Sequence, residues 1–189
     1  MPRKNKKLPR HLLVIRTSAM GDVAMLPHAL RALKEAYPEV KVTVATKSLF
    51  HPFFEGLDVG FLDIETRRTH RGIRGAIRFA REAAELKIDA VADMHNVLRS
   101  KMVRAALHLR GIPVSVIHKG RIEKYMRLGR GSEGVKPLKH TVIRYCDVFR
   151  RLGFDFPDPR PAEKRPRPNP MGEKRGVWIG FAPFSTQPG

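Results

Sequence analysis

The sequence predicts an α/β fold, a Rossmann-like parallel sheet with helices on both faces. Short apolar runs alternate with longer segments of helical periodicity along most of the chain, which is the order of a parallel sheet with crossover helices. Of the 189 residues, 42% are hydrophobic and 29% are charged, a composition that supports a packed core and differs from that of a disordered chain. In such a fold the binding crevice lies at the carboxyl ends of the strands.

The individual elements follow from the spacing of apolar residues. The run 12–15 (LLVI) is typical of a buried strand, and from Val23 apolar residues recur at helical spacing until Pro38 ends the helix. Later strands are predicted at 41–46, 59–64, 88–94 and 114–117, a short helix or loop at 48–56, and helices at 73–86, 98–109 and 139–152. The residues expected to face the core are Ile73, Ile77, Ala80 and Ala84 in one helix and Val142, Cys146, Phe149 and Leu152 in another.

The predicted domain organisation has four parts. Residues 1–10 form a basic tail, and residues 11–155 form the Rossmann-like domain. Residues 156–176 contain six prolines and repeated charge, which is typical of an extended linker. Residues 177–189 begin with a fresh apolar strand, and a lone strand is not a domain. We therefore expect a second domain that is cut short in this sequence.

Charge and cysteine content limit the class of protein. Lysine and arginine number 37 against 18 acidic residues, a formal net charge of +19, which attracts polyanions such as nucleic acid, anionic lipid or phosphorylated glycolipid. A merely solubilising surface is the alternative. The single cysteine, Cys146, excludes a disulfide within the chain, as expected in the cytoplasm, and it is expected in the core. No apolar run approaches the roughly 20 residues that span a bilayer, and no signal peptide is evident.

The loop 16–22 (RTSAMGD) is the first candidate site, because it follows the first strand. Gly21 permits a close backbone approach by a ligand, and Asp22 stands where the next helix starts. Asp22 has two interpretations, a helix cap or a base that faces the crevice. The loop lacks the G-x-G-x-x-G pattern, which argues against a dinucleotide site.

The segment HLLVIRTSAMGDVAMLPHALRALKEAYPEVKVTVAT resembles the start of glycosyltransferase family 9, the heptosyltransferases of lipopolysaccharide core synthesis. That family has a strand, a short Ser/Thr loop ending in Gly-Asp, and a helix with an early proline. Segments 93–100 (DMHNVLRS), 140–145 (HTVIRY) and 179–185 (IGFAPFS) resemble further parts of the family in the same order. The resemblance covers nearly the full chain.

The resemblance implies the N-terminal half of a GT-B enzyme, in which two Rossmann-like domains face each other across a cleft. Domain 11–155 would bind the acceptor, and the domain that opens at 177–189 would bind the nucleotide-sugar. The implied reaction is inverting, metal-independent transfer of heptose or a related sugar from ADP-heptose to a lipopolysaccharide core or other glycolipid, with Asp22 as general base. The 189 residues alone are expected to be inactive. No cofactor is implied, and the expected location is cytoplasmic, peripheral on the inner face of the inner membrane.

The family match also assigns binding roles by position. Arg99 would bind acceptor phosphate or stabilise charge in the transition state, with a solvated surface arginine as the alternative. Asp93 would orient the acceptor or play a structural role, holding Arg99 or capping the next helix. Acceptor-binding candidates are Thr17, Ser18, Met20, Gly21, Asp93, Asn96, Arg99, Ser100, Arg121 and Lys124; donor-phosphate candidates are Ser185 and Thr186; no metal ligands are predicted, and His95 is expected to be a loop or crevice residue.

Two basic segments are candidates for contact with anions. Arg71, Arg74, Arg78 and Arg81 recur at helical spacing, so they form either a stripe that contacts an anionic membrane or a solvated face. The second segment contains Lys119, Arg121, Lys124, Arg127 and Arg130. A nucleic-acid-binding module and a non-catalytic Rossmann-like binding domain remain as alternative functions. The first would need stacking aromatics within the basic patches, and aromatic residues make up only 7% of the chain.

Overall fold

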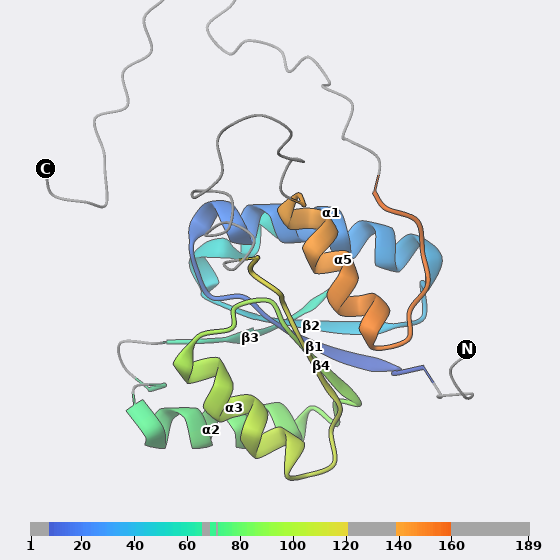
Figure 1. Ribbon diagram of the computed structural model, residues 1–189. Helices are drawn as coiled ribbons and strands as arrows, with labels where there is room; N and C mark the ends of the chain where they lie inside the picture. The colour runs from blue at the N-terminus through green and yellow to red at the C-terminus, as the bar shows by residue number, and fades with distance from the viewer. Residues whose placement is uncertain (1–7, 66–68, 71, 121–138, 160–189) are drawn as a thin grey trace, which may run out of the picture. The chain divides into compact units, whose positions relative to one another are not determined.

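Five parallel strands form one sheet in the order β3-β2-β1-β4-β5 (Figure 1), which confirms the predicted Rossmann-like fold. The computed structural model describes residues 8–65, 69–70, 72–120 and 139–159, all within one unit, Met1–Pro159. The strands are β1 (His11–Ile15), β2 (Lys41–Thr46), β3 (Gly60–Asp63), β4 (Ala90–Asp93) and β5 (Val114–Val116). The helices are α1 (Met20–Ala36), the 3₁₀-helix η1 (Ser48–Phe54), α2 (Gly72–Glu85), α3 (Leu98–His108) and α5 (Thr141–Arg151).

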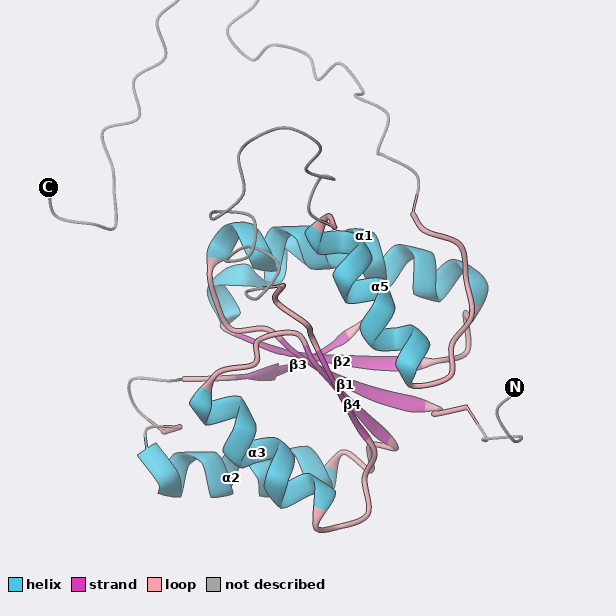
Figure 2. Ribbon diagram, in the orientation of Figure 1, coloured by secondary structure: helices cyan, strands magenta, loops and turns pink. Residues whose placement is uncertain are grey.

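The helices form two layers on opposite faces of the sheet. Helices α1 and α5 cover one face, and α2 and α3 cover the other (Figure 2). From β1 the chain first extends the sheet through β2 and β3, then returns to place β4 on the other side of β1. The strand order therefore reverses between β1 and β4, and a crevice is expected at the carboxyl ends of these two strands.

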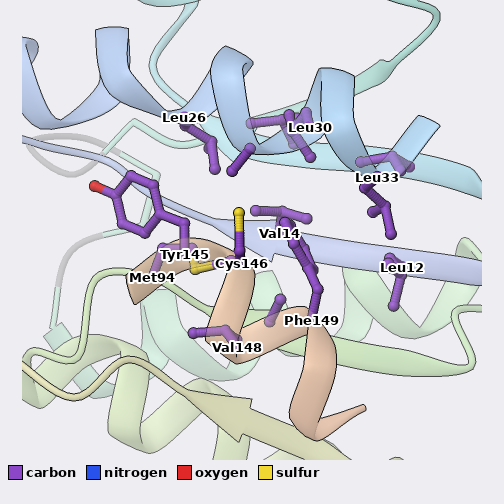
Figure 3. Close-up of a cluster of buried hydrophobic side chains, with 14 of the residues drawn as sticks. Leu12, Val14, Leu26, Leu30, Leu33, Met94, Tyr145, Cys146, Val148 and Phe149 are labelled. Carbon is purple, nitrogen blue, oxygen red and sulfur yellow. The ribbon is translucent and has the colours of Figure 1, made fainter. Parts of the chain in front are cut away.

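The core on the α1 side is built from alternate residues of the central strand. Leu12 and Val14 of β1 pack against the apolar face of α1 and against Phe149 of α5 (Figure 3). All four residues predicted to face inward from helix 139–152 are buried, three of them in α5 and Leu152 at its C-terminal end. Burial raises the pKa of the Cys146 thiol to about 11, so this cysteine stays protonated in the core, where it was predicted.

The core on the α2 side uses the other residues of the same strand. Leu13 and Ile15 pack with Phe79 of α2 and with Leu107 of α3. Both faces of β1 are therefore covered, which explains why the run 12–15 is continuously apolar rather than alternating.

The predicted inward face of α2 is wrong for two of its four residues. The side chains of Ile73 and Ile77 are 69% and 47% exposed, whereas Phe79 and Ala80 are buried. The buried stripe of α2 is rotated towards small residues, Gly75 and Ala76 among them, and Gly75 lets the helix lie close against the backbone of His70. The two isoleucines remain beside the exposed arginines of the same helix.

Gly75 is required by the close approach of the chain segment that precedes α2. A Cβ at this position would lie 2.2 Å from the backbone carbonyl carbon of His70, and that residue is held by hydrogen bonds to Glu65 and Glu82. We expect Gly75→Ala to lower the free energy of unfolding by about 1–3 kcal/mol, measured by urea denaturation. Gly21→Ala is the matched control, since no atom other than those of its chain neighbours and of its own helix backbone lies within 4 Å of its Cβ position. Equal stability of the two variants would contradict the predicted clash.

Candidate functional site

The loops after β1 and β4 meet at the point where the strand order reverses. The Met94 amide donates to the Ile15 carbonyl over 3.1 Å, and the Arg16 amide donates to the Ala45 carbonyl of β2 over 3.1 Å. The loops 16–22 and 93–101, both predicted to reach the crevice, are thus adjacent.

Arg16 holds Asp22 at the start of α1. The buried Arg16 guanidinium donates to the carboxylate of Asp22 and to the Met94 carbonyl. The Tyr145 hydroxyl of α5 donates to the backbone carbonyl of Asp22 over 3.0 Å, and the guanidinium carbon lies 6.0 Å from the Tyr145 ring centroid, within the range of a cation–π contact. The Asp22 side chain remains 43% exposed. It is therefore fixed in position and still reachable from solvent.

The helix-cap interpretation of Asp22 is wrong. Helix α1 begins at Met20, three residues before the predicted Val23, and its N-cap is Ala19, without a side-chain capping bond. Asp22 lies in the first turn, where the helix dipole favours a negative charge. Its carboxylate forms an ion pair with Arg16 and does not cap the helix.

Asp93 is fully buried at the end of β4, and both oxygens of its carboxylate accept hydrogen bonds from nearby residues of the chain. One carboxylate oxygen accepts from the amides of His95 and Asn96 over 2.9 and 2.8 Å, and the other accepts from Arg104 over 3.2 Å. The predicted structural role is thus visible, although the paired arginine is Arg104 of α3 and the Arg99 side chain lies outside the described atoms. Asp93 fixes the course of the loop that follows β4.

Asn96 and Ser100 complete this loop. Asn96 adopts a left-handed φ of 45° and donates to the Ile117 carbonyl over 3.3 Å, while Lys119 donates to the Asn96 carbonyl over 3.3 Å. The Ser100 hydroxyl both accepts from the Val97 amide and donates to the Val97 carbonyl, each over 3.0 Å. Both side chains bind backbone groups and shape the entrance to α3.

The remaining candidates fall into two groups. Near Asp22, Thr17 is buried, Ser18 is partly buried, and Met20 and Gly21 are exposed. Arg121, Lys124, Ser185 and Thr186 lie outside the described residues, as do Arg71 and residues 160–176 of the predicted linker. Phe156, the first predicted linker residue, is buried against the domain.

A pocket of about 320 Å³ opens between α2 and α3 at the carboxyl end of the sheet. Its walls come from the end of β1, the loop after β4, α2 and α3, and Asp22 is not among the lining residues. Sequence reasoning placed Thr17 and Ser100 in the site but missed the wall formed by α2. It also missed the contacts of Arg16 and Tyr145 with Asp22. The one available signal was an arginine directly after a buried strand, in LLVIR.

His95 lines the pocket at the crevice, where it was predicted, and the charges of Arg16 and Asp22 act on its ring. Burial, then the positive charges of Arg16 and Lys119, lower the pKa of the imidazole to about 4, against the opposing effect of Asp93 and Asp22. The ring is therefore neutral at pH 7. Its Nδ1 atom is buried and has no hydrogen-bond partner among the described residues.

The lowered pKa of His95 predicts a loss of stability in acid. The unfolded chain binds a proton near pH 6.5, and the folded chain does so only near pH 4. The contribution of His95 is therefore complete above pH 6.5 and is lost as the pH falls towards 4, at no more than about 1.4 kcal/mol per pH unit. We expect His95→Gln to flatten the fall in melting temperature between pH 7 and 4.5. The exposed His108, changed to Gln, is the control, and identical pH profiles for the two variants would refute the prediction.

Two kinds of feature are absent from the described residues. In residues 8–65, 69–70, 72–120 and 139–159, no three His, Cys, Asp or Glu side chains are grouped closely enough to hold a metal ion. None of the helices in these ranges is long and apolar enough to cross a membrane.

Comparisons with known proteins give matches by structure alone, since no family model and no curated protein matches the sequence. The chain is similar to a glycosyl transferase family 9 protein from Veillonella parvula, with a TM-score of 0.59, 17% identity, and coverage of 81% of this chain and 44% of that one. It is also similar to E. coli heptosyltransferase WaaC with ADP-2-deoxy-2-fluoro heptose, with a TM-score of 0.54, 23% identity, and coverage of 79% and 50%. A structure of WaaC with ADP gives a TM-score of 0.52 at 22% identity, with coverage of 78% and 49%.

These similarities confirm the predicted resemblance to glycosyltransferase family 9 at the level of the fold. The chain spans about half the length of the solved proteins that it matches.

Proposed function

We propose that this chain is the acceptor-binding half of an inverting glycosyltransferase. The complete protein would move heptose, or a related sugar, from ADP-heptose to a lipopolysaccharide core or another glycolipid. The observation that carries the proposal is the Asp22 carboxylate, held by Arg16 yet 43% exposed, where the strand order reverses in a fold shared with a family 9 protein and a heptosyltransferase.

The chemistry asks for a base in this position. A sugar hydroxyl is a poor nucleophile at neutral pH, and a positioned carboxylate that accepts its proton contributes about 10²–10⁴-fold to the rate. In the proposed step the acceptor oxygen bonds to the anomeric carbon of the donor as the bond to the diphosphate breaks on the opposite face. The hydroxyl proton passes to Asp22, and the bonding electrons leave with ADP. Arg16 orients the base, and Ser185, Thr186 and the rest of the complete protein would bind the donor phosphates.

The test is a transfer assay with the complete gene product that contains these residues. Purified protein is incubated with heptose-deficient lipopolysaccharide core in three parallel reactions. Each reaction contains one donor: ADP-heptose, ADP-glucose or UDP-glucose. We expect transfer from ADP-heptose and release of ADP in equal amount. Transfer from another donor would support the assignment as a glycosyltransferase and change the assigned donor sugar. A folded protein that binds the donors without transferring any sugar would support the non-catalytic alternative.

We also propose that the outer face of α2 contacts an anionic membrane that carries the acceptor. Arg74, Arg78 and Arg81 are exposed along this helix, beside the exposed side chains of Ile73 and Ile77. Cations next to apolar side chains on one helix face suit the boundary between anionic headgroups and acyl chains. The net charge of +19 acts in the same direction.

Changing Arg74, Arg78 and Arg81 together to Gln is expected to weaken binding to phosphatidylglycerol-containing vesicles. Each cation near such a surface contributes about 1 kcal/mol, so the triple variant should bind roughly 100-fold more weakly at low salt, measured by vesicle sedimentation. The control changes Arg10, Arg31 and Lys41, which are exposed elsewhere on the domain, and removes the same net charge. Equal weakening in both variants would mean that net charge, and not this helix face, governs the binding.

A further inference from the structure

The pocket between α2 and α3 is not used by the chemistry proposed at Asp22. Its volume of about 320 Å³ is at the lower end of the range for small-molecule sites. The walls are mainly apolar and include Ile15, Ala76, Phe79 and Val103. No Lys, Arg, Asp or Glu of the described chain lines it.

Some polar atoms of the residues that line the pocket already have hydrogen-bond partners, and others do not. The Ser100 hydroxyl is bonded to the Val97 backbone, and both ring nitrogens of His70 have partners in Glu65 and Glu82. The Nδ1 atom of His95 is buried and unpartnered within the described ranges. His95 and Thr17 both line the pocket and give it a polar end beside the crevice.

This lining distinguishes between three kinds of occupant. A phosphate or carboxylate would lose its hydration without meeting an opposite charge among the described residues that line the pocket, which is costly. An alkyl chain would suit the walls but leave the polar groups of His95 and Thr17 without a partner, which is also unfavourable. A sugar ring presents hydroxyl groups at its edge and C–H bonds on its faces, so it satisfies the polar end and the apolar walls together.

We propose that this pocket binds one uncharged sugar ring of the acceptor, with hydroxyl groups hydrogen-bonded to His95 and Thr17 and a C–H face against Ala76 and Phe79. The Asp22 carboxylate acts electrostatically on His95, so a ring held by His95 lies in the region of the base. The sugar site itself depends only on the pocket, whereas its assignment to an acceptor rests on the proposed function.

The test measures binding by the 189-residue chain and needs no sugar transfer. The probes are methyl α-D-mannopyranoside, mannose 6-phosphate and 1-butanol, followed by saturation-transfer NMR and by the shift of the His95 imidazole resonances. We expect millimolar binding of the uncharged glycoside and at least tenfold weaker binding of the other two. His95→Leu and Ala76→Leu should each weaken glycoside binding at least tenfold. The controls His108→Leu, at an exposed site, and Ala84→Leu, on the same helix outside the pocket, should leave it unchanged.

Three results would overturn the sugar site: no binding of the glycoside to folded chain, binding that neither pocket variant weakens, or preferential binding of 1-butanol or of the phosphate. If Ala76→Leu does not fold, His95→Leu carries the test. The two proposals fail separately. Glycoside binding in the pocket together with no sugar transfer by the complete protein overturns the proposed function alone, and transfer without glycoside binding overturns the sugar site alone.

Discussion

Replacing Asp22 with asparagine is expected to lower sugar transfer by the complete protein by about 10²–10⁴-fold, the contribution of a general base. Asparagine keeps the size of the side chain and an oxygen that accepts a hydrogen bond from Arg16, but it cannot take a proton from the acceptor hydroxyl. The loss should therefore appear in kcat, with the KM for the acceptor and the melting temperature little changed. Initial rates at several acceptor concentrations separate these quantities.

The matched control for Asp22→Asn is Glu35→Gln, which neutralises an exposed carboxylate on the same helix. This variant should transfer sugar at the unmodified rate. If Asp22→Asn keeps its rate as well, the carboxylate serves only as the partner of Arg16, and the base must be sought elsewhere.

Removing the Asp93 carboxylate is expected to cause a large loss of stability. Asp93→Ala leaves the amides of His95 and Asn96 without acceptors and the Arg104 guanidinium without its partner. Breaking such a buried arrangement typically costs about 3–5 kcal/mol. For a protein of this size a loss of about 3 kcal/mol corresponds to a fall of roughly 10 °C in melting temperature, which differential scanning calorimetry would measure.

Asp89 provides a control with a similar bonding pattern and more solvent. Its carboxylate accepts from the amides of Arg10 and His11 over 2.7 and 3.0 Å, but the residue is exposed, so water replaces the lost partner. We expect Asp89→Ala to cost about 1 kcal/mol. Equal losses for Asp89→Ala and Asp93→Ala would show that burial does not set the strength of the Asp93 network.

The fold was predictable because its signals are local. Runs such as 12–15 and 41–46 are short and apolar, and the helices between them show their spacing within a few turns. The rotation of α2 was not predictable in this way, because the helix has two adjoining apolar stripes and either could have faced the core. One contains Ile73 and Ile77, and the other contains Ala76 and Phe79. The choice depended on how closely Gly75 lets the helix approach the backbone of His70.

The candidate site was predictable only in outline. The strand order places the loops after β1 and β4 together, so Asp22 and Asp93 could be assigned to one region from the sequence. Their partners could not. Arg104 stands almost two turns into α3, and Tyr145 is 123 residues from Asp22, distances along the chain that local patterns do not bridge.

The hydrogen bond from Tyr145 to Asp22 also sets an order of events during synthesis. At about 5–20 residues per second, the ribosome needs roughly 6–25 s to make the 123 residues that separate the two partners. During this interval α1 has left the ribosome without α5, whose Phe149 and Cys146 later cover its apolar face. A nascent chain therefore exposes Leu26 and Leu30 to chaperones and to aggregation until α5 is made. Only then can the hydrogen bond from Tyr145 stabilise the first turn of α1, which contains Asp22.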